Sequence, residues 1–98
     1  MEDIMIDYYF DDIIYVDYLG DDERKKRIVI NIHDTLNEAY STKEVLETRL
    51  VQNASGAFLT VVVSNDEKTM ASVSKFINNY TEAYLKYMKE QDNEEISD

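Results

Sequence analysis

The chain has 98 residues, enough for one hydrophobic core and too few for two. It carries 21 Asp and Glu against 10 Lys and Arg, a formal net charge of -11, and no Cys. This composition excludes disulfides, zinc–thiolate sites and thiol nucleophiles, and it disfavours direct binding to nucleic acid or anionic lipid, which reward Lys and Arg.

Positions 4–19 alternate between two kinds of residue, which predicts one long β-strand. The even positions are apolar or aromatic except Asp12, and they should face the core. The odd positions, which should face water, include Asp7, Tyr9, Asp11, Tyr15 and Asp17. We expect a bulge or bend at Asp11-Asp12, because a two-residue hairpin there would favour Gly or Asn.

A polar turn over residues 20–26 and a second strand over residues 27–33 are predicted next. Alternate Ile residues of the second strand would share one face, and the two strands would pair as an antiparallel hairpin. Residues 34–43 fit either a short helix capped by Asp34 or a loop.

Residues 44–52 fit either a helix or a strand. Ser41 with Glu44 resembles a capping box, which favours a helix. Residues 53–56 (Asn-Ala-Ser-Gly) instead fit a hairpin loop built on a type I turn with a positive φ at Gly, and a β-branched segment follows. We favour the hairpin, with strands near 44–52 and 57–63.

A long helix is predicted from Asp66 to about Gln91, beginning with the capping box of Ser64 and Glu67. Its apolar stripe has a 3-4 spacing and consists of Met70, Val73, Ile77, Tyr80, Tyr84 and Tyr87. Such a helix is ~39 Å long, whereas a strand of about eight residues covers only ~27 Å, so the helix should overhang the sheet.

The overhanging end would carry Tyr84, Tyr87 and Met88. The aromatic stripe is explained either as ordinary core or as a self-association seam that forms a homodimer, because its spacing is that of a coiled-coil face. Residues 1–91 are expected to form a single acidic domain, and residues 92–98 a disordered acidic tail.

The first 23 residues hold nine carboxylates and no basic residue. The predicted partner-binding residues are Asp7, Tyr9, Asp11, Asp12, Tyr15, Asp17, Asp21, Asp22 and Glu23, with Glu2 and Asp3 completing the acidic set. An ordered anionic row interleaved with Tyr can imitate a phosphate backbone and attract the Lys/Arg-lined surface of a nucleic-acid-binding protein. The alternatives are a solvated acidic face that maintains solubility and, with weaker support, a Ca²⁺ or Mg²⁺ site where Asp17 approaches the three acids of the turn.

The basic run Arg24–Arg27 and the single His33 are both interpreted as parts of the fold and not of a functional site. The basic run Arg24–Arg27 directly follows the acids and is interpreted as local charge compensation at a hairpin turn. The alternative is a contact with nucleic acid or another anion, although four positive charges beside nine negative ones make a poor patch for it. His33, the only His, is interpreted as an ordinary residue at a strand end, because no nucleophile motif, phosphate loop or second His accompanies it. We therefore expect no catalysis and no cofactor.

The predicted fold is α+β, with a small antiparallel sheet of about four strands and one long C-terminal helix packed on one face. No apolar run approaches the roughly 18 residues of a membrane span, and Met1-Glu2-Asp3 is unlike a signal peptide. We therefore expect a cytoplasmic protein, in a bacterium or, if a phage encodes it, in the host cytoplasm.

The predicted function is that of a small acidic inhibitor, which binds the basic nucleic-acid-binding surface of a partner protein by mimicking the charge of DNA or RNA. In size, charge and composition the chain is similar to phage- and mobile-element-encoded antagonists of bacterial defence, such as anti-CRISPR and antirestriction proteins. That similarity covers no motif, so it transfers no functional residue. The alternatives are an immunity or antitoxin protein that neutralises a nuclease toxin, and a structural adaptor that acts through its C-terminal helix.

Overall fold

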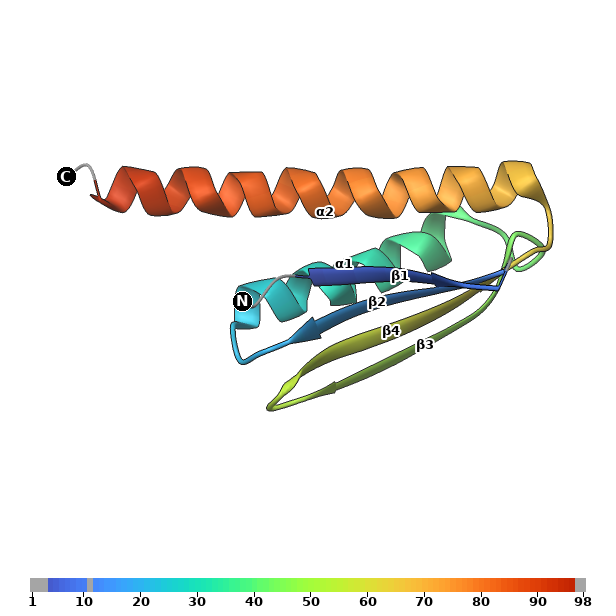
Figure 1. Cartoon of the computed structure of the whole chain (residues 1–98), viewed down its shortest axis with the longest axis horizontal. Helices are drawn as coiled ribbons and strands as arrows, with labels where there is room; N and C mark the ends of the chain where they lie inside the picture. Colours follow the sequence, from blue (N-terminus) through green and yellow to red (C-terminus); the bar gives the residue numbers. More distant parts are fainter. Residues whose placement is uncertain (1–3, 11, 97–98) are drawn as a thin grey trace.

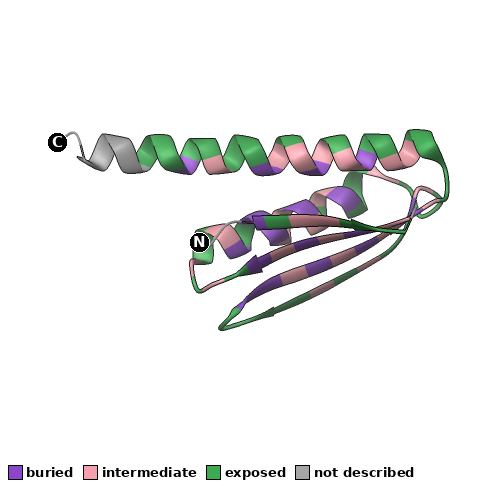
Figure 2. Cartoon of the chain, in the orientation of Figure 1, coloured by how far each residue is buried: buried purple, intermediate pink, exposed green. Residues whose placement is uncertain are grey.

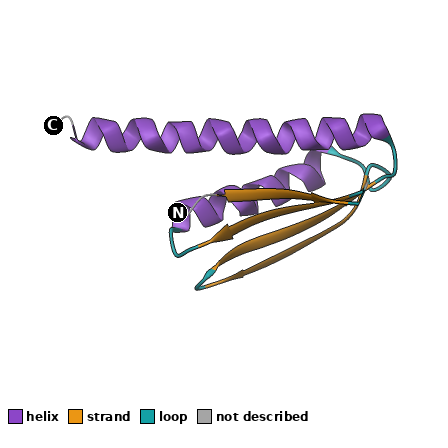
Figure 3. Ribbon diagram, viewed as in Figure 1, coloured by secondary structure: helices purple, strands orange, loops and turns teal. Residues whose placement is uncertain are grey.

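The computed structural model describes residues 4–10 and 12–96, with side chains described as far as Gln91. In chain order its elements are β1 (Ile4–Tyr9), β2 (Ile13–Leu19), α1 (Glu23–Ala39), β3 (Val45–Asn53), β4 (Gly56–Val63) and α2 (Glu67–Ile96). The strands form one antiparallel sheet in the order β1-β2-β4-β3. Both helices lie on the same side of this sheet (Figures 1 and 3), which confirms the predicted α+β class.

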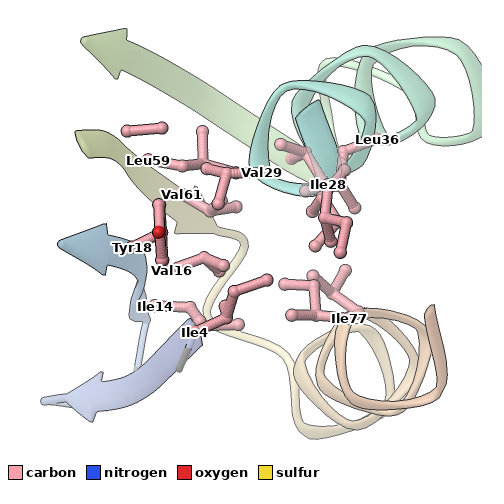
Figure 4. Close-up of a cluster of buried hydrophobic side chains, with 14 of the residues drawn as sticks. Ile4, Ile14, Val16, Tyr18, Ile28, Val29, Leu36, Leu59, Val61 and Ile77 are labelled. Atoms are coloured by element: carbon pink, nitrogen blue, oxygen red, sulfur yellow. The ribbon is translucent and has the colours of Figure 1, made fainter. Parts of the chain in front are cut away.

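The core lies between the sheet and the two helices (Figures 2 and 4). It is built from the alternate residues of the central strands, together with one stripe from each helix. The fully buried members include Ile14, Val16 and Tyr18 of β2, Leu59, Val61 and Val63 of β4, Val29, Ile32 and Leu36 of α1, and Val73 and Ile77 of α2. Because side chains alternate along a strand, the other residues of β2 and β4 face away from both helices.

The prediction of one strand over residues 4–19 is wrong, because β1 and β2 form an antiparallel hairpin in which Tyr9 is opposite Ile13. Phe10 adopts a φ of 58°, a left-handed conformation that Gly or Asn more often takes, so the turn forms without either residue. Three residues separate the paired ends, and this odd number keeps the even positions of both strands on the inner face. Phe10 lies in the loop between the strands and has 87% of its surface exposed.

The predicted polar turn over residues 20–26 and strand over residues 27–33 are also wrong, since α1 covers most of both. Asp22 caps the helix, and its carboxylate accepts a hydrogen bond from the backbone N–H of Arg24 at 2.9 Å. The buried residues of α1 are Lys26, Ile28, Val29, Ile32 and Leu36. Their spacing follows one face of a helix. In a strand the adjacent residues Ile28 and Val29 would point to opposite faces, so they could not both be buried against the same sheet.

The predicted second hairpin is confirmed as β3 and β4, which pair antiparallel from Val45 to Asn53. The Asn53 side chain accepts a hydrogen bond from the N–H of Ser55 at 2.8 Å, which shapes the loop between the strands. The Ser41 N–H donates to the Glu44 carboxylate at 3.0 Å as in a capping box, yet these residues close a turn before β3.

The long C-terminal helix is confirmed, and α2 continues to Ile96, beyond the predicted end near Gln91. It extends past the end of the sheet, as Figure 1 shows. The side chains of residues 92–98, which form the predicted acidic tail, lie outside the described residues. Within the part of the chain that is described, neither helix has an apolar stretch sufficient to cross a membrane.

Candidate partner-binding face

The face of the sheet opposite the two helices is covered by no other described element (Figures 1 and 3). We call it the open face. The paired strands place its side chains in three rows, Tyr9-Ile13-Val62-Glu47, Asp7-Tyr15-Thr60-Arg49 and Met5-Asp17-Phe58-Val51. Neighbouring rows are ~7 Å apart along the strands, so the open face is one continuous surface.

Most residues of the open face are apolar or aromatic, although nothing packs on them. Met5 is 58% exposed, Val51 50% and Tyr9 49%. The solvent face of a one-sided antiparallel sheet is ordinarily polar. A continuous exposed apolar surface with a polar rim is typical of an interaction site in a folded protein.

Two carboxylates lie close together on this apolar surface. Asp7 is paired with Tyr15 and Asp17 with Met5, so Asp7 and Asp17 are diagonal neighbours on adjacent strands. Diagonal neighbours of this kind are ~7–8 Å apart. No ion pair links either carboxylate to a described residue. Arg49, the basic residue of the open face, lies three strands from Asp7, or ~14 Å.

The surroundings of Asp17 disfavour its charge. Burial raises the pKa of the Asp17 carboxyl, and the neighbouring charge of Asp7 raises it further. Asp17 lies between Met5 and Phe58 in its row, which accounts for the loss of solvent. The ionised form therefore costs the folded protein some stability at neutral pH, as charged groups at functional sites often do.

We predict that Asp17→Asn stabilises the protein at pH 7. The pKa of Asp17 is higher in the folded than in the unfolded chain, so its stabilising contribution is present below the unfolded pKa and is lost as pH rises through the folded pKa. The gain in the free energy of unfolding should be below about 1 kcal/mol, because solvent still screens this carboxyl. Urea unfolding at pH 7 and in acid measures it. A variant less stable than wild type at pH 7, or a gain that persists in acid, would contradict this explanation.

Tyr9 and Tyr15 add a fixed aromatic pair beside the two carboxylates. Their rings meet edge to face, with centroids 5.0 Å apart and an interplanar angle of 66°. Such a contact restricts both rings before any partner arrives, so little side-chain entropy remains to be lost on binding. The predicted residues Asp7, Tyr9, Tyr15 and Asp17 therefore form one cluster on the open face.

The remaining predicted acids lie elsewhere. Asp12 lies in the β1–β2 loop, and its carbonyl accepts the N–H of Val63 at 2.7 Å. Asp21 is exposed beyond the other end of β2. Asp22 and Glu23 serve the start of α1, where the Asp22 carboxylate is 3.5 Å from the Arg24 Nε and the Glu23 carboxylate 3.4 Å from the Lys26 Nζ.

Three of the early acids, Glu2, Asp3 and Asp11, lie outside the described residues. Among the residues that are described, no three His, Asp or Glu side chains gather as the ligands of a metal ion would. The acids around the β2–α1 turn, which gave the weaker metal hypothesis, instead include the helix cap Asp22 and the ion-paired Glu23.

Sequence reasoning missed the apolar part of the open face, which includes Met5, Ile13, Phe58 and Val62. A signal was available in β4, whose sequence GAFLTVVV is apolar at nearly every position. A strand that is apolar on both faces is ordinarily covered on both faces. The run therefore predicts a second contact surface as well as a core strand.

The basic run Arg24–Arg27 occupies the first turns of α1 and not a hairpin turn. Lys26 is buried, and its Nζ donates to the Glu23 carboxylate at 3.4 Å and to the carbonyl of Ala54 at 3.3 Å. Arg24 and Lys26 therefore compensate the charges of Asp22 and Glu23 respectively, as predicted. His33 also lies on α1 and not at a strand end, with its Nδ1 2.9 Å from the Asp34 carboxylate.

The predicted self-association residues Tyr84, Tyr87 and Met88 line a groove of about 370 Å³ between α2 and α1. The other lining residues are Glu23, Arg24, Arg27, Ile28, Asn31 and Gln91. Tyr80 stacks on Tyr84 with ring centroids 4.6 Å apart, and burial, followed by the contact with Tyr84, raises the pKa of Tyr80 to about 12.

No protein-family model, curated protein or solved structure matches this chain.

Proposed function

We propose that this chain is a small non-catalytic inhibitor that binds the basic nucleic-acid-binding surface of another protein through its open face. Asp7 and Asp17 would occupy the place of backbone phosphates and receive Lys or Arg side chains of the partner. The proposal is of the anti-defence type, an antagonist of a bacterial nucleic-acid-binding protein, and it places the chain in the cytoplasm of a bacterium or of a phage host.

The observation that supports this function best is the pair of carboxylates without basic partners on an exposed apolar surface. Like charges held close together repel, and a cation brought by a partner would relieve that repulsion. Removal of water by the surrounding Met5 and Phe58 would strengthen the attraction, because the effective dielectric constant falls. The apolar and aromatic side chains supply the area that a stable contact needs.

Long-range attraction supports the same class of partner. The formal net charge of -11 favours encounter with a basic surface and opposes encounter with nucleic acid itself. Asp12 and Asp21 lie beyond opposite ends of β2, so they would act as rim charges. Rim charges of this kind change the rate of association more than they change the lifetime of the complex.

The test is a capture experiment with two matched variants. Wild type, Asp7→Lys/Asp17→Lys and Glu38→Lys/Glu82→Lys are immobilised side by side and exposed to bacterial extract. The first pair of substitutions alters the open face, whereas Glu38 and Glu82 are exposed on the helices, and both double variants change the net charge equally. We expect a basic nucleic-acid-binding protein on the wild type and the helix variant only.

The captured protein is then purified and titrated. Binding to the Asp7→Lys/Asp17→Lys variant should be about a hundredfold weaker or more, since reversed charges leave the partner's cations unpaired. Added DNA or RNA should displace the wild-type chain, and salt should weaken the complex steeply. A partner that the open-face variant retains at full strength, or that nucleic acid does not displace, would disprove the proposal.

A further inference from the structure

We infer that the groove between α1 and α2 receives the β1–β2 loop of a second copy of this chain, with Phe10 as the inserted side chain. This inference goes beyond the proposed function, because neither the groove nor the loop includes Asp7 or Asp17. It depends on two features of the described residues that no contact within one chain explains, an exposed Phe and an apolar groove with a basic rim.

Phe10 is the first feature. It is 87% exposed, more than any other large apolar side chain in the described residues. Its φ of 58° is strained for a residue with a bulky side chain, and such outliers are concentrated at binding sites and switches. In the sequence two acids, Asp11 and Asp12, directly follow it. The loop therefore presents an aromatic ring beside negative charge.

The groove is the second feature. Ile28 and Met88 are its buried apolar residues, while Tyr84 and Tyr87 are exposed on the α2 side. Its volume of about 370 Å³ falls within the roughly 300–1,000 Å³ range of ligand pockets. Such a groove can receive an aromatic side chain.

The charged residues around the groove favour the β1–β2 loop of a second copy as its occupant. Arg24, Arg27 and Glu23 lie on its α1 side, and the Glu23 carboxylate is 3.4 Å from the Lys26 Nζ. Two positive charges at one groove stand out in a protein whose net charge is -11. Arg24 is 3.5 Å from the Asp22 carboxylate, whereas Arg27 forms no ion pair with a described residue. An aromatic ring with a carboxylate nearby matches this combination, because the Phe10 ring would fill the apolar part while the Asp12 carboxylate approaches Arg27.

The contact has to form between two chains. Phe10 lies beside Met70 near the start of α2, and the groove lies along residues 84–91 of the same helix. Met70 and Tyr87 are about 26 Å apart along the helix at ~1.5 Å per residue. The β1–β2 loop and the first turns of α1 lie at opposite ends of the molecule in Figure 1. The loop of one chain therefore cannot reach its own groove.

Sedimentation velocity at increasing concentration tests the inference. Wild type should self-associate, as a closed dimer if the exchange is reciprocal or as longer chains if it is not. Phe10→Ala and Arg27→Glu should each weaken association by about tenfold or more, because a buried aromatic anchor and a paired charge dominate such contacts. Leu46→Ala, at an exposed apolar position on β3, should change nothing. A monomeric wild type, or unchanged association of Phe10→Ala, would overturn the inference.

A mixture of two variants tests whether the loop and the groove meet each other. Phe10→Ala retains an intact groove and Arg27→Glu retains an intact loop, so the mixture should associate more strongly than either variant alone. No gain on mixing would show that the two features do not contact each other. Asp7→Lys/Asp17→Lys should self-associate like wild type, so failure of this inference and failure of the proposed function remain distinguishable.

Discussion

Val29→Asp should unfold the protein at room temperature, whereas Ile30→Asp should leave it folded. Val29 is fully buried between α1 and the sheet (Figure 4), whereas its neighbour Ile30 is only half-buried. A carboxylate at position 29 would have no partner in the core, and burying it costs several kcal/mol or more. A domain of this size is stable by only about 5–15 kcal/mol, so most or all of the folded population would be lost.

The comparison of the two variants tests α1 directly. A strand over residues 27–33 would place Ile30 on the same face as Ile28 and Ile32, and Val29 on the opposite face. In that case Ile30→Asp would be the more damaging change. Circular dichroism and urea unfolding of both variants distinguish the two structures, and a stable Val29→Asp protein would contradict the helix.

Tyr18→Ala should lower the free energy of unfolding by about 3–5 kcal/mol, the usual cost of removing a buried aromatic ring. Tyr18 is fully buried at the end of β2, and its hydroxyl accepts the N–H of Asp22 at 3.1 Å. The ring therefore connects the sheet to the residue that caps α1. A Cβ at Gly20 would collide with the Tyr18 hydroxyl, so the chain passes close to this group.

Tyr18→Phe keeps the ring and removes only the hydroxyl, so it measures the contribution of the hydroxyl to stability. It should cost about 1–3 kcal/mol, because the N–H of Asp22 loses its acceptor in a partly buried position. Tyr15→Phe is the matched control, since Tyr15 lies on the same strand and faces the opposite side. Urea unfolding should show little change for Tyr15→Phe. Equal losses for the two Phe variants would contradict the assigned role of the Tyr18 hydroxyl.

In the first half of the chain, the β1–β2 hairpin and the helix α1 differ from the predicted strands because local sequence patterns did not show how these segments pair and pack. Alternation over residues 4–19 breaks only at Asp12 and does not show that the strand reverses there, because a loop of three residues keeps the even positions of both strands on the same face. The seven residues 27–33 are too few to separate a period of 2 from a period of 3.6 when Ile and Val are adjacent. Only the continuation of the buried stripe to Leu36, with the cap at Asp22, identifies the helix.

The candidate site was predicted only in part, because alternation shows which face a residue is on but not which residues on neighbouring strands are paired. The odd positions of β1 and β2 face away from the helices, so the shared face of Asp7, Tyr9, Tyr15 and Asp17 followed from alternation alone. The sequence presented these residues as a row along one strand. The hairpin instead pairs Asp7 with Tyr15 and brings Asp17 beside it as a diagonal neighbour.

The sequence by itself determined the α+β class, the long helix α2 and the charge of the molecule, because each depends on local periodicity or on composition. It favoured the second hairpin but left residues 44–52 open between helix and strand. Only the tertiary structure decided that a second helix, α1, joins α2 on the covered face of the sheet, which carboxylates become neighbours, and that Tyr84, Tyr87 and Met88 share a groove with Arg24 and Arg27. These results depend on strand register and on helix placement. Both are set by the burial of residues far apart in the chain, which no local segment encodes.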